Sequence, residues 1–262
     1  LNLIMKYLYL LETKKLKQKL LKNLFMTKSK VVDVCLTPHS IDLFDVSNKL
    51  VVVIDVFRAT SAMCTALNSG IKEVIPVETI DRAKTYLNRN NYLVAAERNG
   101  KIVTGFNLGN SPLEYLDNDK LNNRSLVITT TNGTKSIEHV KGADSVILAS
   151  FLNVNAVVQY ILKQNKDVII ICSGWKDRVC LEDMLLAGMI SCKLTVNKSI
   201  LTTQDSVTIV IELYKKARKD MSSFLSQSAY CKRMDLKEDI DYCLQLNTMN
   251  IVPILCNESF IV

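Results

Sequence analysis

The sequence predicts an α/β fold with three layers, α/β/α, a largely parallel or mixed sheet and a helix-rich C-terminal part. Short apolar runs rich in β-branched residues alternate along the chain with helical patterns, which is typical of a sheet covered by helices on both faces. The chain has 262 residues, of which 48% are hydrophobic, and such a chain can bury a full core. After residue 194 the pattern is mainly helical up to residue 245, so a helical layer or small lobe is expected there.

The first predicted elements lead to one stretch, residues 50–70 (LVVVIDVFRATSAMCTALNSG). A first strand is predicted over 31–36. The stretch then begins with a continuous apolar run, which is typical of a strand buried on both faces. It continues through Asp55 and Arg58 into a helical pattern over 60–69. A carboxylate and a guanidinium therefore stand at the C-terminal end of a central strand, where open α/β sheets bind their ligands.

The rest of the chain continues this alternation of strands and helices. Further strands are predicted over 73–77, 92–96, 125–130, 145–149, 168–172 and 251–255. Helices are predicted over 80–88, 137–141, 156–164 and 181–194. The connection over 97–112 (ERNGKIVTGFNLGNSP) is long for a link between elements, which favours a binding loop. Ser111 and Glu114 at its end form a predicted capping box.

The net charge of +7 is confined to one end of the chain. Residues 1–30 carry eight Lys and one Glu, so they account for the whole excess, and the remainder is neutral. The folded body is therefore not expected to bind nucleic acid or a membrane. Residues 1–25 are interpreted as a basic and apolar leader outside the fold, with an amphipathic membrane-surface helix as the alternative. Residues 26–262, with Met26 as the preferred start, are expected to form a single domain, and a division into two lobes near 195 is considered.

The eight cysteines contain no C-x-x-C pair, and most lie within apolar runs. We interpret them as buried thiols of a cytoplasmic protein rather than as a disulfide framework or a zinc site. The chain has two His residues, which argues against a metal site or a catalytic triad built on histidine. No Walker-type or G-x-G-x-x-G motif is present, which argues against nucleotide binding.

Groups of polar residues follow several of the predicted strands. They are Asp55 with Arg58, Glu97 with Arg98, Thr129 to Thr134, Cys172 to Arg178, and Glu182 with Asp183. In a parallel sheet these strand ends share one edge, so the groups can converge. Several acids and several cations in one cleft indicate a divalent metal and an anionic substrate, the arrangement that phosphoryl transfer needs.

Each of these groups also has a structural explanation. Asp55 could cap the helix that follows it, with Arg58 as its surface ion-pair partner. The segment TTTNGT over 129–134 could be a tight turn whose Thr residues cap the next helix. In the functional interpretation its N–H groups and hydroxyls, including those of Thr131 and Thr134, face an oxyanion, and Lys135 adds positive charge.

Two further groups allow different explanations. Glu182 and Asp183 fall in the first turn of a predicted helix, where the helix dipole favours acidic residues. The segment CSGWKDR has the C-x5-R spacing of cysteine-dependent phosphatases, with Cys172 as nucleophile and Arg178 gripping the phosphate oxygens. Lys and Asp replace the small residues that such a cradle prefers, so the cysteine mechanism is the minor alternative.

Five motifs, in order, resemble the 2-phosphosulfolactate phosphatases. They are DVFRATSA from Asp55, AERNGKIVTGFNLGNSP from Ala96, TTTNGTKS from Thr129, CSGWKDRVCLED from Cys172 and DIDYCLQLNTMNIVP from Asp239. The resemblance runs from about residue 31 to the C-terminus. It implies a three-layer α/β/α fold and Mg²⁺-dependent hydrolysis of (2R)-2-phospho-3-sulfolactate to 3-sulfolactate and phosphate, a step of coenzyme M biosynthesis.

The resemblance, together with the strand-end groups, assigns roles to particular residues. The catalytic candidates are Asp55, Arg58, Glu182 and Asp183. The candidate Mg²⁺ ligands are Asp55, Glu97, Glu182 and Asp183. The candidate substrate-binding residues are Arg58, Arg98, Asn110, Ser111, Thr131, Asn132, Gly133, Thr134 and Lys135, of which Arg58 and Arg98 would neutralise the phosphate and the sulfonate.

The chain departs from the family pattern at Asn107, where the family usually has Asp, and at residues 172–174, where CSG replaces CAG. The loss of a carboxylate at Asn107 keeps two alternatives open. One is the same fold acting on another small 2-phospho acid, and the other is a non-catalytic binder of phosphorylated or sulfonated acids. The expected partner is a small anionic substrate, and a homodimer is considered.

Overall fold

The computed structural model describes residues 30–116, 121–196, 200–202 and 204–262. The predicted leader over residues 1–25 and the preferred start at Met26 lie outside this range. None of the helices in the described range is both long enough and apolar enough to cross a membrane.

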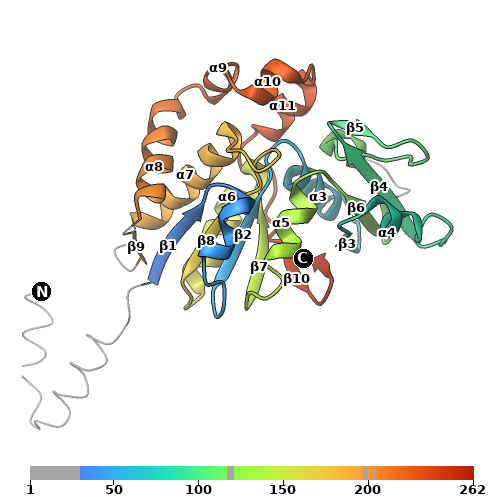
Figure 1. The fold of residues 1–262 in the computed structure, drawn as a ribbon, viewed down its shortest axis with the longest axis horizontal. Coiled ribbons are helices and arrows are strands. Elements are labelled where there is room, and N and C mark those ends of the chain that lie inside the picture. Colours follow the sequence, from blue (N-terminus) through green and yellow to red (C-terminus); the bar gives the residue numbers. More distant parts are fainter. Residues whose placement is uncertain (1–29, 117–120, 197–199, 203) are drawn as a thin grey trace, which may run out of the picture.

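The strands form one mixed sheet of eleven strands (Figure 1). They are β1 (Lys30–Cys35), β2 (Leu50–Ile54), β3 (Glu73–Pro76), β4 (Tyr92–Arg98), β5 (Lys101–Ile102), β6 (Ser125–Thr129), β7 (Ser145–Ala149), β8 (Val168–Cys172), β9 (Ile200–Leu201), β10 (Ile254–Cys256) and β11 (Ser259–Ile261). Their order across the sheet is β5-β4-β6-β3-β11-β10-β7-β2-β8-β1-β9. One parallel section contains β4, β6 and β3, and the other contains β7, β2, β8, β1 and β9.

Helices cover both faces of the sheet, as the sequence predicts. The α-helices are α3 (Ala59–Asn68), α4 (Ile80–Lys84), α5 (Gly133–His139), α6 (Val154–Lys163), α7 (Leu181–Thr195), α8 (Asp205–Ala217), α9 (Met221–Leu225), α10 (Ala229–Arg233) and α11 (Lys237–Cys243). The described residues include the short 3-10 helices η1 (Pro38–Leu43), η2 (Pro112–Tyr115) and η4 (Phe151–Asn153). The helix-rich C-terminal part is confirmed, and Figure 1 shows α9, α10 and α11 (orange to red) along the upper edge of the sheet.

The alternation of side chains along β2 explains the three layers. Leu50, Val52 and Ile54 face a core cluster that includes α6, α7 and α8. Val51 and Val53 point to the opposite face, where they join α3 and α5. All five side chains are buried, since successive residues of a strand point to opposite faces and here both faces are covered. The continuous apolar run in the sequence is thus explained by burial on two sides.

The end of the chain forms a hairpin rather than the single strand predicted over 251–255. The antiparallel strands β10 and β11 lie between β7 and β3 and join the two parallel sections of the sheet. Each junction has a single paired position, Ile254 with Ile147 and Phe260 with Val74. The short paired length on both sides makes this hairpin a narrow link between two larger blocks of parallel strands.

The connection over 97–112 also differs from its prediction. β4 continues to Arg98 and forms an antiparallel hairpin with β5. In the turn between them, Asn99 and Gly100 have φ angles of 55° and 82°, the left-handed region that Asn-Gly pairs adopt in tight hairpin turns. The beginning of the expected binding loop is therefore an ordered hairpin.

The helix predicted over 137–141 begins four residues earlier, at Gly133. The reason lies in a local pair of threonines. The N–H of Thr134 donates to Oγ1 of Thr130 at 3.2 Å, and the N–H of Thr130 donates to Oγ1 of Thr134 at 3.3 Å. Side-chain oxygens that accept the first free N–H groups of a helix favour its start at that point.

Helix α3 sits between the two parallel sections and fixes the segment that precedes it. Its residues from Ala59 to Leu67 are all buried, and it packs against both β3 and β7. The polar residues at the end of β2 are therefore held between a buried strand and a buried helix.

Close packing of α7 against α8 generates the first prediction. A Cβ atom at Gly188 would lie 2.0 Å from the carbonyl oxygen of Val210 and 2.8 Å from Cβ of Tyr214. Gly188→Ala should therefore push the two helices apart and lower the free energy of unfolding by about 1–3 kcal/mol, the usual cost of overpacking. Urea unfolding followed by circular dichroism measures this change.

Gly142→Ala is the matched control, because no atom lies within 4 Å of a Cβ at that position. Its midpoint should stay close to that of the wild type. Equal midpoints for all three proteins would contradict the close approach of α7 and α8.

Candidate active site

Six of the predicted site residues line one cavity at the C-terminal ends of β2 and β4. The cavity has a volume of about 490 Å³ and is called here the Asp55 cavity. The six residues are Asp55, Arg58, Glu97, Asn110, Thr131 and Asn132. A second cavity of about 550 Å³, called here the Ser111 cavity, shares Arg58 and Asn110 with the first. The strand ends thus converge as the parallel sheet predicts.

Asp55 follows β2 directly and combines the two roles that its sequence position suggests. Its Oδ1 accepts a hydrogen bond from the N–H of Ala59 at 3.3 Å, at the start of α3. Its Oδ2 receives no hydrogen bond within the described part of the chain, and a Cβ at position 133 would lie only 2.9 Å from it. Gly133 therefore leaves the space beside Oδ2 that any larger residue would fill. One oxygen caps the helix, and the other is available to a ligand.

Glu182 and Asp183 lie in the first turn of α7, behind Asp55, and line neither cavity. Both are buried. The carboxylate of Asp183 accepts the N–H groups of Val56 and Gly174, each at 2.9 Å. These two bonds fix the end of β2 and the loop after β8 to one side chain.

Burial and mutual repulsion disturb the protonation of these three carboxyls. Burial, and then the charge of Asp183, raise the pKa of Asp55 well above its ordinary value. Burial raises the pKa of Glu182 to about 7, with Asp55 adding to the effect. Burial and the charge of Glu182 raise the pKa of Asp183 to about 8. Several buried negative charges close together are unfavourable unless they are protonated or neutralised by a cation.

The carboxylates of the site fit a Mg²⁺ ion that is bound by only a few protein ligands. Among the residues that the structure describes, no three acidic, His or Cys side chains are grouped as a ready metal site. Mg²⁺ commonly binds through one or two carboxylates, with water and phosphate oxygens completing its shell. The free Oδ2 of Asp55 meets that requirement, and Asp55 also acts electrostatically on Glu182. Asp183 is less available, because backbone N–H groups occupy both of its oxygens.

Glu97 lines the Asp55 cavity but is engaged by two loops. Its Oε1 accepts the N–H of Gly100 at 2.5 Å, and its Oε2 accepts the N–H of Thr131 at 3.1 Å. The Oγ1 of Thr131 also lies 3.2 Å from both carboxylate oxygens. Glu97 therefore ties the β4–β5 hairpin to the turn before α5, and its predicted role as a metal ligand stays a prediction.

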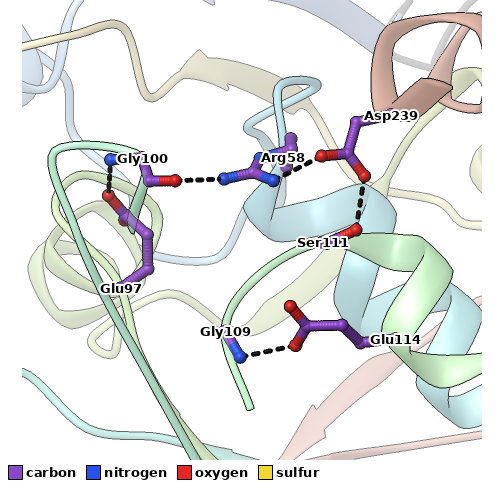
Figure 2. Close-up of polar contacts among 7 residues, drawn as sticks. All are labelled: Arg58, Glu97, Gly100, Gly109, Ser111, Glu114 and Asp239. Atoms are coloured by element: carbon purple, nitrogen blue, oxygen red, sulfur yellow. Dashed lines mark hydrogen bonds and ion pairs between the residues drawn. The ribbon is translucent and has the colours of Figure 1, made fainter. Parts of the chain in front are cut away.

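Arg58 is part of a buried polar network that Figure 2 shows. Its Nη1 donates to Oδ2 of Asp239 at 2.5 Å, and its Nη2 donates to the carbonyl oxygen of Gly100 at 2.9 Å. The hydroxyl of Ser111 donates to Oδ1 of Asp239. The predicted capping box is consequently wrong: Ser111 makes no side-chain cap bond, and Glu114 accepts the N–H of Gly109 at 2.5 Å instead.

Four predicted substrate-binding residues, Arg98, Gly133, Thr134 and Lys135, do not line either cavity. The guanidinium of Arg98 donates to the carbonyl oxygen of Glu97 and to Oγ1 of Thr129. Lys135 forms a surface ion pair with Asp177 at 3.4 Å. Thr134 is engaged with Thr130, as described above. Their predicted contacts with the substrate gain no support from these positions.

The arrangement also argues against the cysteine mechanism. Cys172 is fully buried at the end of β8, where burial and the charge of Asp183 raise the pKa of its thiol. The chain then turns back, with the N–H of Trp175 donating to the carbonyl oxygen of Arg178 at 2.9 Å. Gly174 permits this turn, because a Cβ there would lie 2.2 Å from the same oxygen. Neither Cys172 nor Arg178 lines the Asp55 cavity, so their positions give no support to the minor cysteine alternative.

Several residues that line the Asp55 cavity were not predicted. Tyr230 and Arg233 come from α10, and Trp175 comes from the loop after β8. Asp239 was visible only as part of a motif, although it holds Arg58 from a position 181 residues away. A signal for Asp239 existed in the DIDYC motif. The sequence spacing of Tyr230 and Arg233 contains no signal of a role in the site, because it does not reveal where α10 packs.

Asn107 lies away from the site. It is exposed and lines a third cavity with Leu93, Leu108 and Arg124, and it lines neither the Asp55 cavity nor the Ser111 cavity. The departure from the family pattern at this position therefore removes no carboxylate from the Asp55 cavity.

Comparison with known proteins assigns the family. The model of the 2-phosphosulpholactate phosphatase family matches residues 35–258. A probable 2-phosphosulfolactate phosphatase of Caldanaerobacter subterraneus subsp. tengcongensis is 40% identical over 230 residues, which cover 84% of this chain and 93% of the relative. A protein of the same description from Thermotoga maritima is 38% identical over 234 residues, covering 88% of this chain and 98% of the relative.

A third relative, from Clostridium acetobutylicum, has the same description and is 33% identical over 228 residues, which cover 85% of this chain and 96% of its own length. These matches extend over nearly all of the fold described above. They confirm the family that the motifs indicate and its enzyme class, phosphoric monoester hydrolase. The chain belongs to the 2-phosphosulfolactate phosphatase family.

Proposed function

We propose that the protein hydrolyses (2R)-2-phospho-3-sulfolactate to 3-sulfolactate and phosphate in a Mg²⁺-dependent reaction. The observation that carries the proposal is the pairing of Asp55 and Arg58 on the wall of one cavity, each almost completely buried. A carboxylate oxygen without a hydrogen bond and a guanidinium fixed in place suit a metal-bound phosphoryl group.

In this mechanism Asp55 would be the first ligand of the metal, and Glu182 would be the second. When bound, Mg²⁺ supplies positive charge that polarises the phosphoryl oxygens. Arg58 uses two of its N–H groups for Asp239 and Gly100. A guanidinium has five N–H donors, so Arg58 still has donors for a phosphoryl oxygen. The hydrolysis adds one water molecule and breaks the bond between phosphorus and the ester oxygen on C2.

The same proposal includes the setting of the reaction. Coenzyme M biosynthesis is the pathway to which such a step belongs, as the resemblance implies. All eight cysteines are free, which suits a reducing compartment, and we propose a cytoplasmic location. The homodimer considered above stays a prediction.

The central test is phosphate release from the proposed substrate. The purified protein should release phosphate from 2-phosphosulfolactate, lose this activity in EDTA and regain it when Mg²⁺ is restored. Asp55→Asn should lower kcat by about 100-fold or more, a loss typical for a group that stabilises charge in the transition state. A colorimetric phosphate assay measures all of these rates.

Cys172→Ala is the matched comparison, because the cysteine mechanism needs that thiol and the metal mechanism does not. We expect turnover close to that of the wild type. Abolished turnover in a folded Cys172→Ala protein, or full activity in EDTA, would overturn the metal mechanism.

Asp239 should act as a positioning residue for Arg58. Asp239→Asn keeps the shape of the side chain but removes the charge that holds the guanidinium, and kcat/KM should fall by about 10- to 100-fold, since hydrogen bonds to charged groups contribute about 1.5–3 kcal/mol. Steady-state kinetics with a thermal unfolding control measures the effect.

Asp241→Asn on the same helix provides the control, since Asp241 forms an exposed ion pair with Lys237 and should leave kcat/KM unchanged. If Asp239→Asn is fully active, Arg58 does not depend on this ion pair.

The raised pKa values predict a dependence on pH. The folded protein keeps protons on these carboxyls over a pH range in which the unfolded chain has released them. This range begins at about pH 4, the ordinary pKa of a carboxyl, and ends at the raised pKa values of about 7 for Glu182 and about 8 for Asp183. Stability contributed by these groups therefore falls as the pH rises. Because Mg²⁺ binds the deprotonated carboxylates, the rise in Tm that it causes should be larger at pH 8 than at pH 5.5.

Differential scanning fluorimetry with and without Mg²⁺ measures this difference. A Mg²⁺ concentration of about 5–10 mM is ordinary in enzyme assays and lies above the usual range of KM values. Asp55→Asn should reduce the shift at pH 8. A Tm that Mg²⁺ leaves unchanged at both pH values would contradict metal binding by these carboxyls.

A further inference from the structure

We propose that Arg233, whose guanidinium lies over the ring of Trp175, binds the sulfonate group of the substrate and so selects sulfonated over unsulfonated 2-phospho acids. This inference rests on the proposed function and identifies the residue that sets its specificity. It draws on the charges of the Asp55 cavity, the geometry of α10 and the chemistry of a substrate with three acidic groups.

The cavity has three cationic side chains in its wall, Arg58, Lys101 and Arg233. Arg58 is neutralised by its buried ion pair with Asp239. Within the described part of the chain, neither Lys101 nor Arg233 forms an ion pair with a carboxylate. These two residues therefore leave positive charge available to an anion, whereas the charge of Arg58 is already balanced.

Arg233 is the better defined of these two cations. The carbon of its guanidinium lies 3.8 Å from the centre of the Trp175 ring and 5.8 Å from that of Tyr230. Its Nη1 donates to the carbonyl oxygen of Ala229 at 3.1 Å. Stacking on an aromatic ring orients the planar fork of Arg and leaves its remaining N–H groups directed outward from the edge. Both cations are exposed, but Lys101 lies on the two-residue strand β5, and its side chain makes no hydrogen bond or ring contact with the described residues.

The rings beneath Arg233 are themselves fixed. Tyr230 packs against Phe57 with ring centres 5.0 Å apart, and Trp175 belongs to the tight turn closed by its bonds with Arg178. The ammonium group of Lys176 also lies 4.6 Å from the centre of the Trp175 ring. Arg233 is therefore a preorganised cation, and little side-chain entropy is lost when an anion binds there.

The layout of the substrate matches two separated anion contacts. Its phosphate ester and its carboxylate are attached to the same carbon, C2, whereas the sulfonate is on C3. Asp55 and Arg58 come from the end of β2, whereas Arg233 comes from α10, so they belong to different parts of the cavity wall. When the phosphate lies at Asp55 and Arg58, the sulfonate is the group free to extend toward Arg233.

The test compares two substrates that differ in the sulfonate alone, 2-phosphosulfolactate and 2-phospholactate. Arg233→Gln should lower kcat/KM for 2-phosphosulfolactate by about 10- to 100-fold, mainly through a higher KM, because a charge-assisted contact made in both ground and transition states is lost. The loss for 2-phospholactate should be at least about tenfold smaller. Arg233→Lys should recover part of the preference, since it restores the charge but not the stacked fork.

Lys232→Gln is the matched control, because Lys232 is an exposed neighbour on α10 and does not line the cavity. Its ratio of kcat/KM for the two substrates should equal that of the wild type. Equal losses on both substrates for Arg233→Gln would overturn the inference and leave the proposed phosphatase activity intact.

A binding measurement separates this inference from the proposed reaction. Isothermal titration calorimetry of 3-sulfolactate and of lactate, with wild type and Arg233→Gln, needs no turnover. Weaker binding of 3-sulfolactate to the variant supports the inference even if no phosphate is released from any substrate. Unchanged affinity, or a wild type that binds neither ligand, would overturn it.

Discussion

The buried ion pair between Arg58 and Asp239 holds the site together. Each side chain is about 6% exposed, and removing one partner of such a pair generally costs about 3–5 kcal/mol, because the other charge stays buried. The pair joins the segment after β2 to α11, and Ser111 and Gly100 complete the hydrogen bonds of the two charged groups. The first central strand and the last helix must therefore be in place together before the cavity has its wall.

This constraint explains why the C-terminal helices belong to the site. α10 contributes Tyr230 and Arg233 to the cavity, and α11 contributes the partner of Arg58. Tyr230, Cys243 and the buried face of α8 share one core cluster with β2 and α7. The helical part that follows residue 195 is thus packed on the same core as the sheet, and it supplies part of the cavity wall.

Strands β1 to β4 and β6 to β8 and the position of Asp55 could be predicted because their signals are local. A run such as LVVVI is readable as a strand buried on both faces, and a carboxylate directly after it lies at the strand end whatever else the chain does. Arg98 shows the limit of the same reasoning. It also follows a strand, but its guanidinium bonds to the backbone of Glu97 and to Thr129. The sequence pattern predicts that a residue lies at an edge of the sheet. The direction of its side chain depends on its contacts, which the pattern does not show. Arg233 and Asp239 depend on how separate helices fold back over the sheet, which no local pattern encodes.

The electrostatic environment of the buried carboxyls of Asp55, Glu182 and Asp183 is unfavourable, whereas that of Arg58 is favourable. Arg58 has a charge partner of its own, whereas these carboxyls face one another, and burial alone already raises their pKa values. Asp183 offsets part of this cost with two backbone N–H groups, and Asp55 offsets less, with a single bond at 3.3 Å to the start of α3. Oδ2 of Asp55, which lies beside Gly133, receives no hydrogen bond within the described part of the chain, and Asp55 lines the cavity. A bound cation or a proton would relieve this unfavourable charge. Without a cation, the site is therefore least stable at the pH values where its carboxylates are deprotonated and most able to bind a metal.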